Sequence, residues 1–399
     1  MTTWFLIVIY LAFISLGLPD SLLGSAWPVI WPEIGSSVGS AGLISMIIAA
    51  GTIVSSLASG KMIQKMGTGN ITLFSCLLTA ISLIGFSMAP SMIWFMILAV
   101  PLGLGAGAVD AALNHYVAAN YQAHHMNWLH CFWGVGATMG PIIMAGYIAD
   151  QNFWRGGYAA VGAIQLVLVI VLLITLPLWK RVAALRETAP TTVTDNETKS
   201  EIRIPGNVLG LRGVKPSLLA FLLYCGVETT VGLWGASYLV GTKSISAEMA
   251  AGWISLYYGG ITFGRFITGF ISLRVHNRLL IRYGQWTTIL GGLLLLLPLP
   301  SSFSVAGFIF IGLGLAPIYP GLLHETPARF GRENSVKLMG YQMAVAYSGT
   351  TLLPPLFGFL AAKTNTDSFP VVVLVLLVLM LFSAETVNRI LLKPQKVGR

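Results

Sequence analysis

Long apolar runs recur along the whole of this 399-residue chain, and they constrain its fold more than any other feature. A helix needs about 20 apolar residues to cross a hydrocarbon core about 30 Å thick. Runs of about that length occupy residues 4–26, 41–60, 71–89, 92–118, 127–148, 157–178, 215–240, 247–272, 279–298, 303–323, 336–361 and 369–391. Because 55% of the residues are hydrophobic and only 9% are charged, the sequence predicts an all-α polytopic membrane protein with twelve transmembrane helices.

Basic residues are distributed unevenly between the segments that connect these runs. Alternate connections and the C-terminal tail hold 19 of the 23 lysines and arginines, and the largest group lies between residues 180 and 215. Cytoplasmic loops carry such an excess, so we predict that both termini are cytoplasmic. The net charge of +9 follows from this bias and requires no nucleic-acid partner.

One long polar stretch, 179–214, divides the chain into six runs and six. We predict an N-terminal six-helix bundle (1–178), a flexible cytoplasmic linker (179–214) and a C-terminal six-helix bundle (215–399). The two halves also look like copies, because "GLGAGAVDAALNH" (103–115) and "GLGLAPIYPGLLH" (312–324) match at an offset of 209. Transporters built from such pseudo-symmetric repeats place the substrate site between the halves near mid-membrane.

Enzyme motifs and metal-ligand spacings are not found in the sequence. It has no H-E-x-x-H, G-x-S-x-G, Walker loop or Cys-x-x-Cys pattern, and its three cysteines lie within spans without metal-ligand spacing. We therefore predict a protein that is not an enzyme and that uses no cofactor or metal. Without a nucleotide-binding element, transport would draw on an ion or substrate gradient.

Several motifs then resemble one family. The segment "GKMIQKMG" (60–67) resembles the loop signature of the major facilitator superfamily, and "GLPDSLLGSAWP" (17–28), "LHCFWGVGATMGP" (129–141) and "GVETTVGLWGASYL" (226–239) resemble its fucose permease and glucose/mannose permease branch. This resemblance implies a major facilitator fold and proton-coupled sugar symport. It also implies gating by the signature loop and its repeat, which contain Gly60, Gln64, Lys65, Gly269 and Arg274; Gln64 departs from the family because an aspartate is usual there.

Two aspartates match the functional carboxylates of this family, Asp20 in the first predicted helix and Asp110 in the fourth. An isolated ionised carboxylate at the centre of a span costs roughly 2.5–3.5 kcal/mol, so such a group is suited to take up and release protons. We predict that both couple transport to protons. The alternatives are that Asp110 only bonds its i+4 neighbour Asn114, and that Asp20 only lines the outer vestibule.

Three further ionisable residues lie within predicted spans. His130 is expected at a depth similar to that of Asp110, where the two could pair and couple protons, although a packing role is an equal alternative. Glu228, in mid-span at the position equivalent to Asp20, is predicted to bind substrate hydroxyls; the alternative is a structural bond to Arg265. Arg265 is grouped with the gating residues, and a partner carboxylate or the membrane edge is its simpler explanation.

Aromatic and amide side chains within spans complete the predicted substrate site, since a sugar offers an apolar face to a ring and hydroxyls to polar groups. The candidates are Asn114, Trp133, Trp234, Tyr238, Tyr257, Tyr341 and Gln342. Aromatic residues are also common in packing and at membrane interfaces. Three tryptophans near the predicted outer surface are interpreted as interfacial residues: Trp27, Trp31 and Trp154.

Together these features predict a proton-coupled symporter that imports a monosaccharide, a hexose or deoxyhexose, across the bacterial cytoplasmic membrane. Its expected partners are a small-molecule substrate, protons and membrane lipids, and we expect a monomer. Two alternatives stay open: a proton antiporter that exports drugs or metabolites, and an uncoupled facilitator or lipid flippase.

Overall fold

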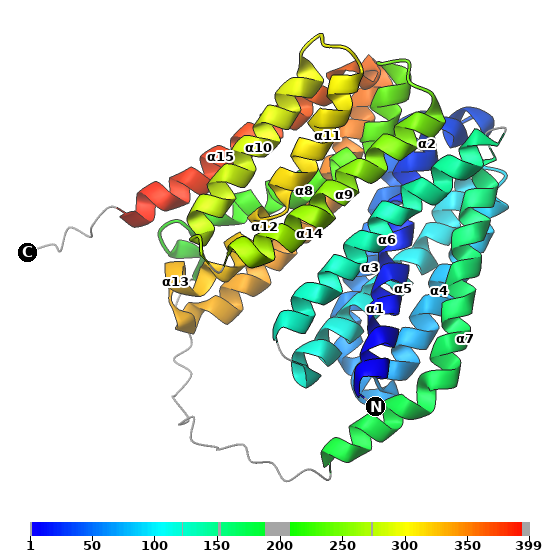
Figure 1. Cartoon of the computed structure of the whole chain (residues 1–399), viewed down its shortest axis with the longest axis vertical. Helices are drawn as coiled ribbons and strands as arrows, with labels where there is room; N and C mark the ends of the chain where they lie inside the picture. The colour runs from blue at the N-terminus through cyan, green and yellow to red at the C-terminus, as the bar shows by residue number, and fades with distance from the viewer. Residues whose placement is uncertain (1, 122, 151–152, 188–207, 273, 393–399) are drawn as a thin grey trace, which may run out of the picture.

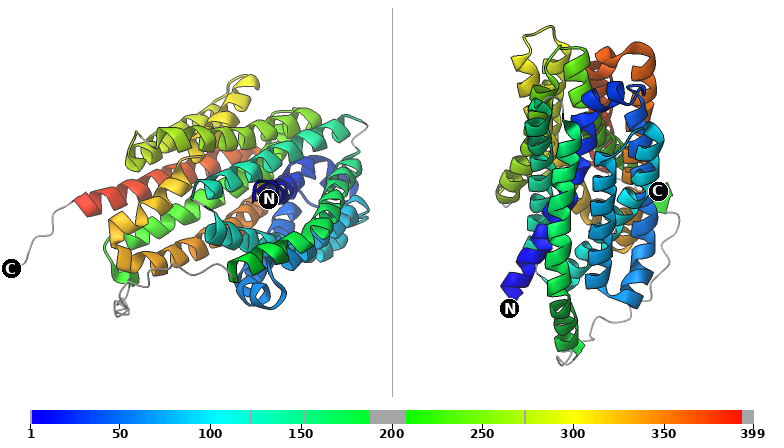
Figure 2. Two further views of the ribbon diagram at one scale, coloured as in Figure 1. Left: turned by 60° about the horizontal axis from the view of Figure 1, so that its bottom comes forward. Right: turned by 90° about the vertical axis from the view of Figure 1, so that its right-hand side faces the viewer.

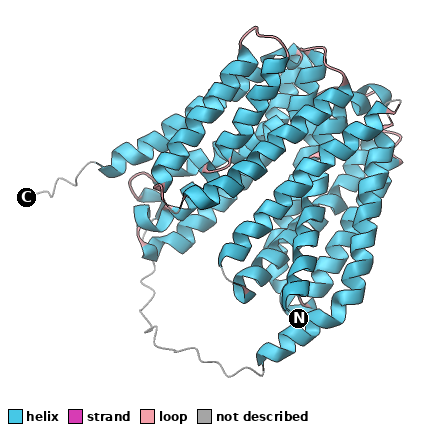
Figure 3. Ribbon diagram, viewed as in Figure 1, coloured by secondary structure: helices cyan, strands magenta, loops and turns pink. Residues whose placement is uncertain are grey.

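The computed structural model describes residues 2–121, 123–150, 153–187, 208–272 and 274–392, and every regular element in these ranges is a helix (Figure 3). In chain order the elements are α1 (Thr2–Asp20), α2 (Leu22–Glu33), α3 (Ser40–Met66), α4 (Thr68–Ser87), α5 (Met92–Asn120), α6 (Ala123–Ala149), α7 (Trp154–Glu187), the 3₁₀ turn η1 (Val208–Gly210), α8 (Val214–Gly241), α9 (Ala247–Ile271), α10 (Asn277–Leu296), α11 (Ser302–Leu315), α12 (Ile318–His324), α13 (Thr326–Phe330), α14 (Arg332–Thr364), η2 (Thr366–Ser368) and α15 (Phe369–Leu392).

Eleven segments of the described chain are long and apolar enough to cross a membrane. Two of them join consecutive helices, because Phe5–Glu33 covers α1 and α2 and Ser302–His324 covers α11 and α12. Helix α9 occupies the predicted span 247–272 but is not among the eleven. The predicted all-α polytopic fold is confirmed.

The region around the predicted linker differs in extent from the prediction. Helix α7 continues to Glu187 instead of ending at residue 178, and residues 188–207 of the predicted linker 179–214 lie outside the described residues. A helix that leaves a membrane need not end there, since its backbone hydrogen bonds are local. The apolar run therefore indicates where the membrane could end but not where the helix ends.

The helices form two groups that lie side by side, α1–α7 and α8–α15, here called the first half and the second half (Figure 1). We call the end of the molecule where α1 begins and α7 ends the proximal end, and the end where α2 ends and α9 begins the distal end. The two halves lie closest toward the distal end and diverge toward the proximal end (Figures 1 and 2).

The two halves repeat the same pattern of neighbouring helices. In the first half α1 packs on α6, α3 on α5 and α4 on α7; in the second half α8 packs on α14, α9 on α11 and α10 on α15. The close approaches repeat as well, since a Cβ added at Gly103 would collide with the carbonyl oxygen of Ile48, and one added at Gly312 with that of Tyr257. Both pairs are separated by the offset of 209 read from the sequence, so the register of the repeat is correct.

The halves meet through small residues that bring helix backbones into contact. Gly24 on α2 lies against Gly232 on α8, and Gly42 on α3 lies against Pro355 on α14. At mid-depth α6 packs along α9, where the Thr138 and Thr262 hydroxyls lie 3.5 Å apart. A large side chain at Gly24 or Gly42 would force the halves apart.

Candidate functional site: a cavity between the two halves

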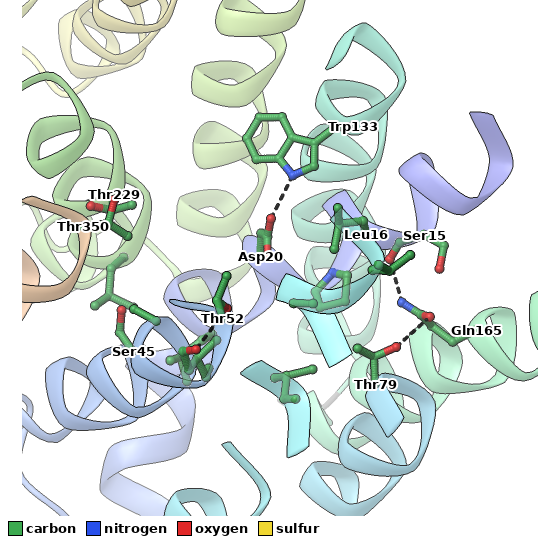
Figure 4. A pocket seen from close by; sticks show the side chains of 18 of the residues that line it. Ser15, Leu16, Asp20, Ser45, Thr52, Thr79, Trp133, Gln165, Thr229 and Thr350 are labelled. Atoms are coloured by element: carbon green, nitrogen blue, oxygen red, sulfur yellow. Dashed lines mark hydrogen bonds between the residues drawn. The ribbon is translucent and has the colours of Figure 1, made fainter. Parts of the chain in front are cut away.

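A cavity of about 310 Å³ lies between the halves (Figure 4). Its volume is at the low end of the range of about 300–1,000 Å³ that is typical of small-molecule sites. The lining comes from α1 to α9 and from α14, and its polar members are Ser15, Asp20, Ser45, Thr52, Thr79, Trp133, Gln165, Glu228, Thr229, Tyr258, Tyr347 and Thr350. Both halves therefore contribute polar groups to one small space.

Asp20 reaches this cavity because a break in the helix interrupts the first membrane segment. Pro19 lacks the backbone N–H that would continue the hydrogen-bond ladder, and α1 ends at Asp20 before α2 begins at Leu22. The Trp133 indole on α6 donates a hydrogen bond to the Asp20 carboxylate at 2.8 Å (Figure 4). Asp20 is solvent-exposed within the structure, and so its carboxylate is available to a proton or a solute in the cavity.

Across the cavity, Glu228 on α8 is paired. The Arg265 guanidinium on α9 donates to Glu228 Oε1 at 3.3 Å, and it also lies 3.4 Å from the Tyr224 hydroxyl. Both charged side chains are mostly buried, with 17% of Arg265 and 15% of Glu228 exposed. The alternative weighed for Glu228 from the sequence, a bond to Arg265, is thus present, while Glu228 also lines the cavity.

Trp133 contacts both Asp20 and the Arg265 partner of Glu228. The Arg265 guanidinium lies 5.4 Å from the centroid of the Trp133 ring, whose indole N–H is bonded to Asp20. Because Trp133 belongs to the first half and Arg265 to the second, this cation–π contact bridges the halves.

Asp110 and Asn114 lie away from the cavity lining. The Asn114 amide donates to the Asp110 carboxylate at 2.8 Å within α5, which is the local bond weighed as an alternative in the sequence. His130 is exposed, and its ring packs edge-on against Phe13 with the centroids 6.0 Å apart. No hydrogen bond or ion pair joins Asp110 to His130 within the described ranges, so the expected pair is not formed in this conformation.

Most of the other predicted substrate residues lie in packing rather than in the cavity. Trp234 donates to the Pro354 carbonyl at 2.9 Å, Tyr238 to the Leu295 carbonyl at 3.0 Å, and Tyr257 to the Glu228 carbonyl at 3.0 Å. Gln342 is fully buried, bonded to Thr326 and Ser217, and Tyr341 is partly exposed on α14. Each of these buried polar groups has its hydrogen-bond partner within the second half. Because the partner replaces water, the group can be buried without contacting a solute.

The interfacial interpretation of two tryptophans is wrong. Trp27 and Trp154 are fully buried. The Trp27 indole donates to the Val38 carbonyl at 2.7 Å, and the Trp154 indole donates to Glu33. An indole whose N–H is bonded within the protein does not need the membrane interface. Trp31 is partly exposed.

The predicted gating residues other than Arg265, which pairs with Glu228 beside the cavity, lie at the proximal end. Gly60, Gln64 and Lys65 near the end of α3 are exposed, as are Gly269 and Arg274 around the end of α9. A Cβ added at Gly60 or Gly269 would meet no atom within 4 Å. These segments are therefore uncovered in this conformation.

Several ion pairs lie at the proximal end of the second half. Glu325 accepts from Arg329 at 3.2 Å and lies 3.5 Å from Arg278, while Arg282 binds Glu385 through two hydrogen bonds of 2.8 and 2.7 Å. Only 3% of the Arg329 side chain is exposed. Burial lowers the pKa of the Arg329 guanidinium from its ordinary value, and the adjacent Glu325 carboxylate opposes that shift.

Several lining residues were not singled out in the sequence: Ser45, Thr52, Thr79, Gln165, Thr229, Tyr258, Tyr347 and Thr350. Serine and threonine are common in membrane helices and give little signal. Gln165 does give a signal in the sequence, because it is the only side chain with hydrogen-bonding capacity between Tyr158 and Thr175. A polar group in such a run marks a site to examine.

Membrane-spanning helices in two repeated halves around a small polar cavity define a membrane transporter rather than an enzyme. The chain belongs to the Major Facilitator Superfamily, whose family model matches residues 9–334. The superfamily resemblance read from the motifs is confirmed.

Three curated relatives align over most of the chain. Bypass of stop codon protein 6 of Saccharomyces cerevisiae is 23% identical over 90% of this chain and 77% of its own. The glucose/mannose transporter GlcP of Bacillus subtilis is 22% identical over 78% of this chain and 77% of its own. The cis,cis-muconate transport protein of Acinetobacter baylyi is 22% identical over 88% and 86%.

Solved structures share the fold. An inward-facing bacterial homologue of the human lysosomal transporter Spinster superposes with a TM-score of 0.76 at 13% identity, covering 98% of this chain and 97% of the other. A D-xylose-proton symporter superposes with a TM-score of 0.73 at 12% identity, covering 99% and 98%. At these identities the similarity concerns the fold alone.

Proposed function

We propose that this transporter is a proton-coupled symporter that imports a monosaccharide by alternating access. The observation that carries the proposal is the Asp20 carboxylate, which faces a small polar cavity between the halves and has a neutral indole as its hydrogen-bond donor. Asp20 forms no ion pair with any residue that the structure describes. A carboxylate of this kind within a membrane span is favoured in its neutral form when the cavity is dry, and in its ionised form when water enters. Asp20 could therefore exchange a proton as the cavity opens and closes.

The other membrane carboxylates are less suited to carry the proton. Glu228 is balanced by Arg265, so its protonation would leave a mostly buried guanidinium without its partner. Asp110 is bonded to Asn114 within its own helix and does not line the cavity. We assign proton coupling chiefly to Asp20 and a supporting role to Asp110 and His130.

The substrate proposal follows from the size and lining of the cavity. A volume of about 310 Å³ suits a small solute better than a large lipophilic drug. The hydroxyls of Thr52, Thr229 and Thr350 donate to backbone carbonyls, so their oxygens can still accept hydrogen bonds from sugar hydroxyls. The Ser45 hydroxyl also lines the cavity, and the Trp133 ring offers an apolar face. Similarity to the glucose/mannose transporter GlcP supports the same class.

The alternating-access part of the proposal uses the contacts between the halves. We place both termini on the cytoplasmic side of a bacterial inner membrane, so that the divergent proximal end faces the cytoplasm and the packed distal end faces outward. Import then requires the distal contacts at Gly24 and Gly42 to open and the proximal gating segments to approach each other. The six-helix halves, 1–178 and 215–399, would move largely as rigid bodies.

Uptake of labelled hexoses into liposomes tests the proposal and separates it from its alternatives. We expect uptake to accumulate sugar when the outside is more acidic and to lose this accumulation when a protonophore is added. Equilibration without accumulation would identify a facilitator, and failure of every hexose to exchange would overturn the sugar assignment. Asp20→Asn should lose the proton-driven accumulation. Asp150→Asn is its matched control, because Asp150 is an exposed residue outside the helices at the distal end.

A further inference from the structure

The Pro19 break creates a backbone acceptor that the first membrane segment cannot satisfy by itself. In a continuous helix the N–H of residue 19 would bond the carbonyl of Ser15, four residues earlier, but proline has no N–H. Ser15 is buried, with 4% of its surface exposed. A buried carbonyl within a membrane needs another donor, since an unsatisfied group there is costly.

Gln165 on α7 supplies that donor. Its Nε2 donates to the Ser15 carbonyl at 2.6 Å, and its Oε1 accepts from the Thr79 hydroxyl on α4 at 3.1 Å (Figure 4). The Gln165 side chain is 1% exposed, so the amide is fixed at both ends rather than free in the cavity. One amide thus connects the broken segment to two other helices.

We propose that Gln165 is a positioning residue for the coupling site: it holds the Pro19 break in the geometry that turns Asp20 toward the cavity and Trp133. The inference rests on the proposed function for its transport readout. Its geometric content, that Gln165 replaces the hydrogen bond that Pro19 removes, can be tested without any substrate.

Charged and titratable groups on several helices lie close enough to Asp20 to influence it electrostatically, and they must be held constant in a test by pH. They are Asp110 on α5, Glu228 on α8 and Tyr258 on α9, with Arg265 beyond the Trp133 ring. None of them contacts Gln165 through a hydrogen bond within the described structure. A substitution at Gln165 therefore changes the position of Asp20 without removing a charge around it.

The decisive experiment is a double-mutant cycle of Gln165→Leu and Pro19→Ala. Alanine at residue 19 restores the backbone N–H, so Ser15 no longer depends on Gln165. We expect Gln165→Leu alone to lower proton-driven uptake about tenfold and to move its pH midpoint by about one unit, the equivalent of 1.36 kcal/mol. Pro19→Ala alone is the reference for the second background, because the break itself positions Asp20; in that background Gln165→Leu should change neither the remaining uptake nor its pH midpoint. Additive effects in the two backgrounds would overturn the proposal.

Gln285→Leu is the matched control. Gln285 is also fully buried, and its amide donates to the Met380 carbonyl at 3.3 Å inside the uninterrupted helix α15. Its loss should leave the pH midpoint of uptake unchanged, whether or not it lowers thermal stability. An equal shift of the midpoint in Gln285→Leu would show that any lost buried amide suffices, and the positioning role would be rejected.

A second readout separates this inference from the proposed function. Leu23 lines the cavity just after the break, so the alkylation rate of Leu23→Cys, in a chain without its three native cysteines, reports the geometry of the segment. We expect Gln165→Leu to change this rate and Pro19→Ala to cancel the change, even if no sugar is transported. If Gln165→Leu fails to fold, recovery of folded protein by Pro19→Ala supports the proposal and continued misfolding refutes it.

Discussion

Gly42 provides a test of how the two halves close at the distal end. A Cβ added there would lie 2.7 Å from the Cα of Pro355, whereas ordinary contact begins at 3.4 Å. Gly42→Ala must therefore separate α3 from α14 by at least 0.7 Å, the difference of these two distances, because neither backbone can turn aside as a side chain could. Overpacking of this kind costs about 1–3 kcal/mol.

The expected consequence is a shift in the conformational equilibrium. Since about 1.4 kcal/mol corresponds to a factor of ten, the population closed at the distal end should fall about 5- to 150-fold relative to the open one. Helix propensity does not enter this equilibrium, because the gain of about 1 kcal/mol for alanine over glycine in a helix interior is the same in the closed and the open conformation. Any opening therefore comes from the contact between the halves.

Gly252→Ala is the control, as a Cβ at Gly252 on α9 meets nothing within 4 Å and gains the same helix propensity. Spin labels at Met88 and Leu297, which are 69% and 46% exposed in different halves, report the distal separation by pulsed EPR. We expect longer distances in Gly42→Ala only. Identical distance distributions in the wild type, Gly42→Ala and Gly252→Ala would refute the reasoning.

Two further predictions concern buried charges. Arg265→Gln should lower the free energy of unfolding by about 3 kcal/mol because it leaves Glu228 unpaired. Adding Glu228→Gln should restore most of that loss. A double variant as unstable as Arg265→Gln would contradict this reasoning. At the proximal end, Glu325→Gln should destabilise by about 3 kcal/mol because Arg329 is 3% exposed, while Glu385→Gln, whose partner is 46% exposed, should cost less than about 1 kcal/mol. Chemical denaturation in detergent measures both, and equal losses would show that burial does not govern these pairs.

The membrane spans and the repeat register could be read from the sequence because both depend on local patterns. Apolar length predicts a span regardless of what packs around it, and the Gly103 and Gly312 approaches lie at the predicted offset. Asp20 and Glu228 could also be selected, since an ionisable residue within a span requires an explanation.

The partners of these residues could not be predicted, because they depend on how each helix is rotated. Membrane helices carry apolar residues on the lipid face and on the packed face alike, so the sequence does not show which side meets the cavity. Trp133 and Trp234 are therefore indistinguishable in the sequence, although one donates to Asp20 and the other to the Pro354 carbonyl. The same limit concealed the Gln165 bond to Ser15, which joins residues 150 positions apart.

Sugar-dependent proton flux tests the central claim most directly. Purified protein in liposomes containing a pH-sensitive dye should acidify the interior when a transported hexose is added outside. Asp20→Asn should abolish this acidification while labelled sugar still exchanges across the membrane, and Asp150→Asn should behave as the wild type. Undiminished acidification by Asp20→Asn would remove the proton-coupling role from Asp20, and alkalinisation of the interior would show antiport instead of symport.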